Sequence, residues 1–181
     1  LPDAMFEHDG QITKREIRAL TLSSLAPRRG ELLWDIGAGA GSIAIEWLLT
    51  DPAMRAIAIE SDAGRAARIR RNAAALGVPG IEVVEGRAPV ALAGLAGPDV
   101  VFVGGGARGA GVVDAALSAL KSGGRLVVNA VTLETEALLL ARHAALGGDL
   151  IRLAVTRAEA VGAVTGWRAA MPVTQWSYVK P

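Results

Sequence analysis

The stretch D-I-G-A-G-A-G-S, Asp35 to Ser42, directly follows the apolar run Leu32 to Trp34. An apolar run that ends in alternating glycines is typical of the first strand and turn of a nucleotide-binding α/β domain. Glycine lacks a Cβ and adopts positive φ without strain, so a ligand can lie directly against the main chain. We therefore expect this turn to contact an adenosine-bearing cofactor. The residues of the expected contact are Gly37, Ala38, Gly39, Ala40 and Gly41.

Apolar runs and segments with helical spacing alternate five times along the chain. The runs that resemble buried parallel strands cover 32–36, 56–59, 81–84, 100–103 and 126–128. The segments with helical spacing cover 42–50, 62–76, 89–95, 110–120 and 132–146. This alternation predicts an α/β fold with a doubly wound, mostly parallel sheet covered by helices on both faces.

The two ends of the chain depart from this alternation. After Gly148, two strand-like stretches, 150–160 and 173–179, predict an antiparallel pair at the edge of a seven-stranded sheet. Before the first strand, a helical segment at about 11–26 contains an amphipathic helix over 13–25. We expect Thr13 to cap it, with Glu16 completing a capping box. A chain of 181 residues predicts one domain over 1–181.

Composition excludes several classes of site. The chain is 51% apolar but has no uninterrupted apolar stretch of about 20 residues, so we expect a soluble, cytoplasmic protein without a membrane partner. It contains no cysteine, which removes disulfides, thiolate nucleophiles and Cys-ligated metals, and we expect no metal site. With 19 basic and 18 acidic side chains, the chain has no broad attraction for nucleic acid.

The identity of the cofactor is indicated by two carboxylates. Glu60 closes the second predicted strand, where an acidic side chain accepts hydrogen bonds from both ribose hydroxyls of an adenosine. The glycines do not match the G-x-G-x-x-G fingerprint of NAD, since Ser42 stands where its last glycine should be. Asp35, just before the turn, would repel a pyrophosphate and attract the ammonium of a methionine moiety. These features favour S-adenosylmethionine (SAM), with S-adenosylhomocysteine as product. Alternatively, the glycines form only a tight turn and Glu60 is a solvated strand end.

A second group of cofactor residues is expected where the third strand ends. Gly86, Arg87 and Ala88 fall where an adenine ring is flanked in this architecture, and Ser61 adjoins Glu60. The small Ala88 would let the ring approach. A plain turn with proline at an early helical position explains the same residues equally well.

Four stretches together resemble the cobalamin-pathway precorrin C15-methyltransferases that also decarboxylate. They are H-D-G-Q-I-T-K-R-E-I-R-A-L (8–20), the D-I-G-A-G-A-G-S turn, V-F-V-G-G-G (101–106) and N-A-V-T-L-E-T (129–135). The resemblance spans almost the whole chain. It implies a class I methyltransferase that methylates precorrin-6B, a tetrapyrrole, at C15 and removes carbon dioxide from the ring C acetate.

The same resemblance carries further implications. It implies that Gln11 and Thr13 close over the cofactor, that the chain forms a homo-tetramer, and that it is the C-terminal half of a fusion with a C5-methyltransferase. Such a fusion would account for a chain that begins at Leu1. One departure concerns Thr156, Arg157 and Ala158, which stand where the family commonly has an S-R-G type segment, and it leaves the role of Arg157 open.

Methyl transfer from a sulfonium to carbon is an in-line displacement, so positioning and exclusion of water matter more than catalytic groups. Gly104 and Gly105 end the fourth predicted strand, where missing side chains leave room for a large flat ring. Asn129 and Thr132 fall on the same carboxyl edge and are candidates for orienting substrate, and Glu134 for proton handling. For the arginines at 65, 68 and 71, an ordinary exposed helix face is the favoured interpretation.

Two other classes of function remain open from sequence. Another class I methyltransferase acting on RNA or protein is the nearest alternative, although the fourth strand lacks an Asn-Pro-Pro-Tyr type ending. An NAD-linked oxidoreductase, or a nucleotide-binding module without activity, belongs to a different class.

Overall fold

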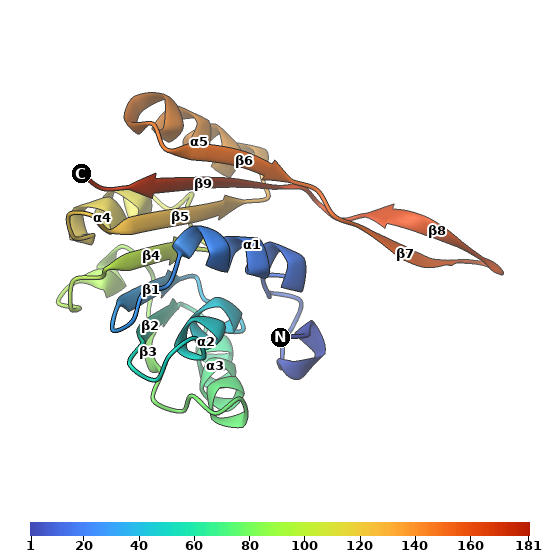
Figure 1. The fold of residues 1–181 in the computed structure, drawn as a ribbon, viewed down its shortest axis with the longest axis horizontal. Coiled ribbons are helices and arrows are strands. Elements are labelled where there is room, and N and C mark those ends of the chain that lie inside the picture. Colours follow the sequence, from blue (N-terminus) through green and yellow to red (C-terminus); the bar gives the residue numbers. More distant parts are fainter.

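The computed structural model describes residues 1–181, and its centre is one seven-stranded sheet (Figure 1). Its strands are β1 (Leu32–Ile36), β2 (Arg55–Glu60), β3 (Glu82–Glu85), β4 (Val100–Val103), β5 (Arg125–Ala130), β6 (Asp149–Leu153) and β9 (Val173–Val179). The order is β3-β2-β1-β4-β5-β9-β6. β1 to β5 pair in parallel, and β9 runs antiparallel to both β5 and β6. The predicted mostly parallel sheet with an antiparallel edge pair is confirmed.

Helices cover both faces of the sheet, because each buried strand is apolar on both sides. The helices are α1 (Arg15–Leu25), α2 (Ser42–Leu48), α3 (Ala63–Ala75), α4 (Val112–Ala119) and α5 (Leu133–Leu146). Leu33 and its neighbours pack against α1, α2 and α3, whereas Trp34 faces α4 and α5. The doubly wound arrangement is therefore confirmed. None of the helices has the length and apolar character to cross a membrane.

The chain reverses its direction of winding between β1 and β4. From β1 it moves outward to β2 and β3, and from β4 it moves the other way to β5. The carboxyl ends of β1 and β4 are adjacent, with Ile36 opposite Val103. Open α/β sheets bind ligands at such a switch point.

Two local expectations were wrong. Helix α1 begins at Arg15, and Thr13 does not cap it: Lys14 is the N-cap residue and makes no side-chain cap hydrogen bond. The Thr13 carbonyl instead accepts a hydrogen bond from Arg18 Nη1 at 2.5 Å, so a side chain of α1 holds the segment that precedes the helix. The helix expected over 89–95 is only a short 3-10 turn, η2 (Val90–Leu92), because the backbone is extended at Ala93 and left-handed at Gly94.

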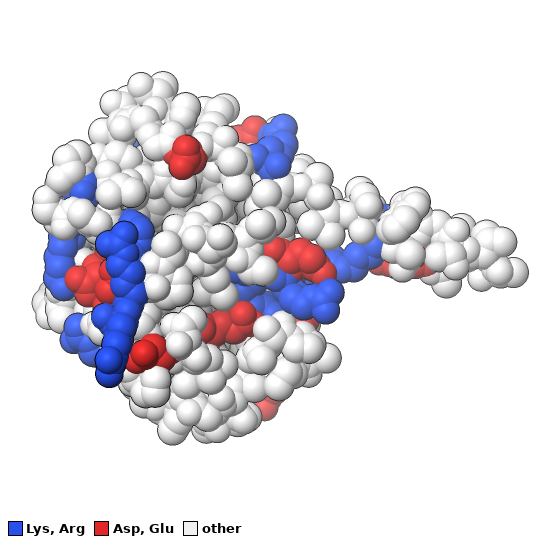
Figure 2. Space-filling view, in the orientation of Figure 1, with Lys and Arg blue, Asp and Glu red and all other residues white.

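The expected strand over 150–160 is two strands, which also corrects the sequence analysis. After β6 the chain leaves the sheet and forms β7 (Thr156–Val161) and β8 (Val164–Ala169), which pair only with each other. This hairpin projects from the body of the molecule (Figure 1), and the surface of its outer part is uncharged in the view of Figure 2. The sequence pattern over 150–160 predicted strand structure, but it did not show that the chain leaves the main sheet after Leu153.

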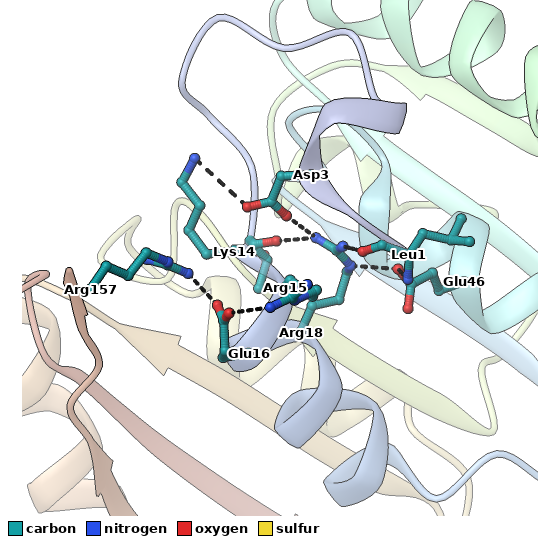
Figure 3. Close-up of polar contacts among 9 residues, drawn as sticks. Leu1, Asp3, Lys14, Arg15, Glu16, Arg18, Glu46 and Arg157 are labelled. Carbon is teal, nitrogen blue, oxygen red and sulfur yellow. Dashed lines mark hydrogen bonds and ion pairs between the residues drawn. The ribbon is translucent and has the colours of Figure 1, made fainter. Parts of the chain in front are cut away.

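The segment before α1 includes a short 3-10 turn, η1 (Asp3–Met5), and is fastened to the body by one buried guanidinium. The Arg18 side chain is fully buried and donates from Nε to Glu46 Oε1 at 2.7 Å and from Nη1 to Asp3 Oδ1 at 3.0 Å. Its guanidinium also lies 5.0 Å from the centre of the Phe6 ring. Figure 3 shows Arg18 reaching α2 and the chain start at once. Arg18 therefore fixes the position of the N-terminal segment between Asp3 and Thr13.

Candidate cofactor and substrate site

A cavity of about 420 Å³ opens at the carboxyl ends of β1, β4 and β5. Its floor is the main chain of the glycine turn, and residues 10–14 form one wall. The base of the β7–β8 hairpin, through Val155 and Arg157, forms another. Of the residues predicted from sequence, eight line it together: Gln11, Thr13, Gly37, Ala38, Gly39, Gly104, Gly105 and Asn129.

The glycine turn is bare because the surrounding backbone is in contact with it. Gly37 has φ +72°, and a Cβ there would lie 2.5 Å from the Gly105 carbonyl oxygen. Gly39 has φ +60°, and a Cβ there would lie 2.8 Å from the Gln11 carbonyl oxygen. A side chain at either position would therefore clash and strain the backbone. The main chains of β1, β4 and the N-terminal segment converge here.

Gly104 and Gly105 have different reasons for lacking a side chain. A Cβ on Gly104 would lie 2.7 Å from the Phe102 ring, which itself lines the cavity. A Cβ on Gly105 would make only ordinary contacts, the shortest being 3.5 Å to the Gly37 carbonyl oxygen. Space for a side chain or a ligand is therefore available at Gly105, which lines the cavity.

Glu60 is not the solvated strand end of the alternative interpretation. It is 5% exposed, and each carboxylate oxygen accepts one main-chain hydrogen bond. Oε2 accepts from Gly39 N at 2.9 Å and Oε1 from Asp62 N at 3.0 Å. A carboxylate has about four acceptor positions, so both oxygens can still accept from hydroxyl groups. Glu60 therefore joins the end of β2 to the glycine turn.

The other expected cofactor residues surround this junction without lining the cavity. Ala40 and Gly41 are buried beneath the turn, and a Cβ on Gly41 would lie 2.8 Å from Ile69 Cγ2. Gly86 follows β3 and donates from N to the Glu60 carbonyl oxygen at 2.9 Å. Ser61 and Arg87 are exposed and Ala88 is half-buried beside them. None of these residues lines the cavity, and the structure connects Gly86 directly to the end of β2.

Asp35 is a buried carboxylate with one oxygen unsatisfied. It is 1% exposed; Oδ2 accepts from Ala44 N at 3.2 Å, whereas Oδ1 has no hydrogen-bond partner. Burial raises the pKa of Asp35 to about 7, with the negative charge of Glu60 acting in the same direction. Buried polar atoms are almost always paired, so Oδ1 is a candidate acceptor for a ligand donor.

Asn129 lines the cavity, but its amide is already bonded. Its Nδ2 donates to Thr21 Oγ1 at 3.0 Å, and its Oδ1 accepts from Gln175 Nε2 at 2.8 Å. Gln175 also donates to Thr21 Oγ1 at 3.1 Å and accepts from Ser24 Oγ at 2.8 Å. This network joins α1 to β5 and β9 and holds the Asn129 side chain in one orientation.

Thr132 and Glu134 do not join the cavity. Thr132 is the exposed N-cap of α5, and its hydroxyl accepts from Thr135 N. The pKa of Glu134 is held below its usual range by its own main-chain N–H, by Thr132 and by Arg108. An exposed carboxylate at a helix start is also stabilised by the helix dipole. The sequence prediction grouped these residues with Asn129, and the structure separates them from it.

The residues that hold the N-terminal segment against α3 were not predicted from sequence. Asn72 is buried on α3 and donates from Nδ2 to the carbonyl oxygens of both Glu7 and Ala40 at 3.0 Å. The three arginines predicted to lie on an exposed face of α3 are at least partly exposed, and they also form ion pairs with the N-terminal segment. Arg65 and Arg68 lie 3.0 and 3.1 Å from Asp9, and Arg71 lies 2.8 Å from Glu7. The spacing of the arginines by three places them on one helix face, and the acidic residues at 7 and 9 have the opposite charge. Together these two features could have predicted the ion pairs.

A family model described as a precorrin methyltransferase domain matches residues 4–180. The chain belongs to the precorrin methyltransferase family. A curated relative from Sinorhizobium sp, named precorrin-6Y C(5,15)-methyltransferase [decarboxylating], is 67% identical over 178 residues. The match covers 98% of this chain and 43% of that relative, so the chain spans less than half of the relative's length.

Two further family members are similar over most of their own length. A cobalt-precorrin-6B C(15)-methyltransferase (decarboxylating) from Salmonella typhimurium is 34% identical, over 84% of this chain and 80% of that protein. The crystal structure of the C-terminal domain of precorrin-6Y C5,15-methyltransferase from Rhodobacter capsulatus has a TM-score of 0.93 and 49% identity. It covers 99% of this chain, which covers 97% of that domain. The fold is also similar to that of a SAM-dependent O-methyltransferase from Thermotoga maritima, with a TM-score of 0.74 and 16% identity, and of a tRNA (m1A58) methyltransferase from Aquifex aeolicus, with a TM-score of 0.72 and 12% identity.

The residues present fit the cofactor that a precorrin methyltransferase requires. SAM has a cationic sulfonium, an ammonium and two ribose hydroxyls, all of which suit carboxylate acceptors. Glu60 supplies spare acceptor positions beside bare main chain, and the unpaired Oδ1 of Asp35 lies under the same turn. Glu60 and Asp35 therefore offer acceptors that suit the hydroxyl and ammonium donors of such a cofactor.

Asp35→Asn tests whether burial raises the pKa of the Asp35 carboxyl. Because its pKa is raised in the folded state, Asp35 contributes stability that is present below about pH 4 and lost as pH rises to about 7. Asn keeps the acceptor for Ala44 N. We expect the stabilising effect of Asp35→Asn to grow between about pH 5 and pH 8 by about 2–3 kcal/mol. Urea unfolding at both pH values measures this, and a pH-independent difference would contradict it.

Proposed function

We propose that this chain transfers a methyl group from SAM to C15 of precorrin-6B and promotes loss of carbon dioxide from the ring C acetate. The observation that carries the proposal is one cavity floored by Gly37 and Gly39 and bounded by Gly104 and Gly105. This cavity joins the glycine turn, where SAM would lie, to a space with apolar walls. The chain also belongs to the precorrin methyltransferase family.

The cofactor roles follow from the contacts at the turn. Glu60 would accept hydrogen bonds from the ribose, and the main chain from Gly37 to Gly39 would lie against the methionine part. Oδ1 of Asp35 would accept from the ammonium. Ser61 and Gly86 to Ala88 would flank the adenine, and Gln11 and Thr13 would close over the cofactor. When bound, SAM supplies the electrophilic methyl group.

The chain's main contribution to the reaction is positioning. Gly105 leaves space next to the turn, and Phe102, Ile43 and Val131 give the cavity apolar surface. Holding a flat ring there aligns the acceptor carbon with the methyl group and excludes water. The hydrogen bonds among Thr21, Asn129 and Gln175 fix the Asn129 side chain that lines the cavity. The reduced macrocycle would supply the electron pair that attacks the methyl group, and the iminium so formed would accept the electron pair released when the acetate loses carbon dioxide. Thr132 and Glu134 lie outside the cavity lining and stay candidates for a substrate-orienting and a proton-handling role.

The assignment of C15, and not C5, rests on which part of the relatives this chain matches. The Salmonella relative is named for the C(15) reaction alone and is matched over 80% of its length. The Sinorhizobium relative is named for both reactions and is matched over 43%. We infer that the part of such a protein outside the match carries the C5 reaction and is fused to this unit.

We also infer that the chain self-associates through the β7–β8 hairpin, as a homo-tetramer. One face of the hairpin carries no charge: Thr156, Ala158, Ala160, Thr165, Trp167 and Ala169 share it by register. Trp167 is 78% exposed there. An isolated two-stranded ribbon is marginally stable in water, and its edges are open to pairing. A second copy of the same face would bury Trp167 and supply the missing contacts.

Turnover with purified chain, precorrin-6B and methyl-labelled SAM tests the proposed reaction. We expect the product to gain one labelled methyl group and to lose one carbon dioxide, as measured by mass spectrometry. NADH should neither bind nor be oxidised. A product that is methylated elsewhere, or no product while S-adenosylhomocysteine binds, would show that this chain acts on another substrate.

Trp167→Lys tests the hairpin as the self-association surface. A charge on the shared face opposes burial, so we expect the molar mass in light scattering to fall from that of a tetramer to that of a smaller species. Leu140→Lys is the control, because Leu140 is also exposed but lies on α5. A monomeric wild-type chain, or equal masses for wild type and Trp167→Lys, would contradict the inference.

A further inference from the structure

The cavity has an uneven distribution of charge. The only charged side chains that line it are Lys14 and Arg157, and no carboxylate lines it. The chain as a whole is nearly balanced, with 19 basic and 18 acidic side chains, so this separation is local. A cavity with apolar walls and cations alone at its rim suits an apolar ring that bears carboxylates.

The two cations come from different parts of the fold. Lys14 directly precedes α1, and Arg157 lies in β7 at the base of the hairpin. The Lys14 side chain is 46% exposed, and the carboxylate that its ammonium faces, Asp3 Oδ2, is 4.0 Å away. This distance is too long for a hydrogen bond, so the ammonium retains donors for a ligand. Figure 3 shows Lys14 and Arg157 on the same side of the start of α1.

Arg157 is bound by a carboxylate that has another partner available. Its Nη2 contacts Glu16 Oε2, and both side chains remain partly exposed. Glu16 Oε1 also accepts from Arg15 Nη2 at 3.1 Å. If a ligand carboxylate replaced Glu16 on Arg157, Glu16 would keep its pair with Arg15. The exchange would therefore leave no unpaired charge, which is the usual cost of breaking an ion pair.

We propose that Lys14 and Arg157 bind peripheral carboxylates of the tetrapyrrole, and that Glu16 occupies Arg157 until the substrate arrives. The inference rests on the proposed function and deepens it, because it names the groups that select a carboxylate-bearing ring over an uncharged one. It also assigns a role to Arg157, which the departure from the family's S-R-G type segment had left open. The planar guanidinium suits a bidentate carboxylate contact, and the ammonium of Lys14 a single point contact.

The test is equilibrium binding of precorrin-6B, followed by tetrapyrrole absorbance, with S-adenosylhomocysteine present so that no reaction occurs. We expect Arg157→Gln to raise the Kd about tenfold or more, and Lys14→Gln to raise it several-fold. We expect Glu16→Gln to lower the Kd, because it frees Arg157. Arg168→Gln is the control: Arg168 is the cross-strand neighbour of Arg157, pairs with Glu159 at 3.0 Å and does not line the cavity.

The sign of the Glu16 effect separates binding from a structural role. If the Arg157–Glu16 pair only holds the hairpin against α1, then Arg157→Gln and Glu16→Gln would raise the Kd alike, and the proposal would be overturned. An unchanged Kd in Arg157→Gln would overturn it too. S-adenosylhomocysteine affinity and the unfolding midpoint, measured for each variant, should equal those of wild type. Failure of the proposed function would show separately, as absent turnover in the wild-type chain.

Discussion

The contact between the main chains of Gly37 and Gly105 sets the geometry of the whole site. A Cβ at Gly37 would lie 2.5 Å from the Gly105 carbonyl oxygen, so the turns after β1 and β4 can meet only if residue 37 has no side chain. This contact occurs where the winding of the sheet reverses, and the crevice that open α/β sheets form at such a point becomes the cavity. Glu60 joins the crevice from β2 by accepting from Gly39 N. The glycine turn and the space beside Gly105 are thus parts of one main-chain arrangement.

The N-terminal segment completes this arrangement from outside the sheet. Asn72 bonds Glu7 and Ala40 together, which ties the segment to the glycine turn through α3. Arg18 fixes the other end of the segment to α2 through Glu46. As a result, residues 10–14 form a wall of the cavity and bring Lys14 to its rim. The ion pairs on α3 are exposed and contribute little stability each, so the buried Asn72 and Arg18 contacts carry most of the anchoring.

Much of the fold and part of the site could be predicted from sequence. Alternating apolar runs predicted the parallel strands because burial on both faces leaves a continuous apolar signal, and the glycine turn and Glu60 were identifiable by their spacing. The cap at Thr13 and the helix over 89–95 failed because tertiary contacts of Arg18 and the left-handed backbone at Gly94 override local propensity. The hairpin could not be separated from β6, since strand alternation does not report which strands pair. The amide network of Asn129 and the wall contacts of α3 join residues far apart in sequence, which no local pattern encodes.

We propose that the junction of the glycine turn with Glu60 holds the adenosyl part of the methyl donor. Calorimetric titration of S-adenosylhomocysteine into Glu60→Ala tests it most directly, with Glu85→Ala as the matched control. Glu85 is paired in register with Glu60 on β3, but it is exposed and bonded to Arg70. We expect Glu60→Ala to weaken binding by about tenfold or more and Glu85→Ala to bind as wild type. Equal affinity in Glu60→Ala and wild type, with both folded, would contradict it.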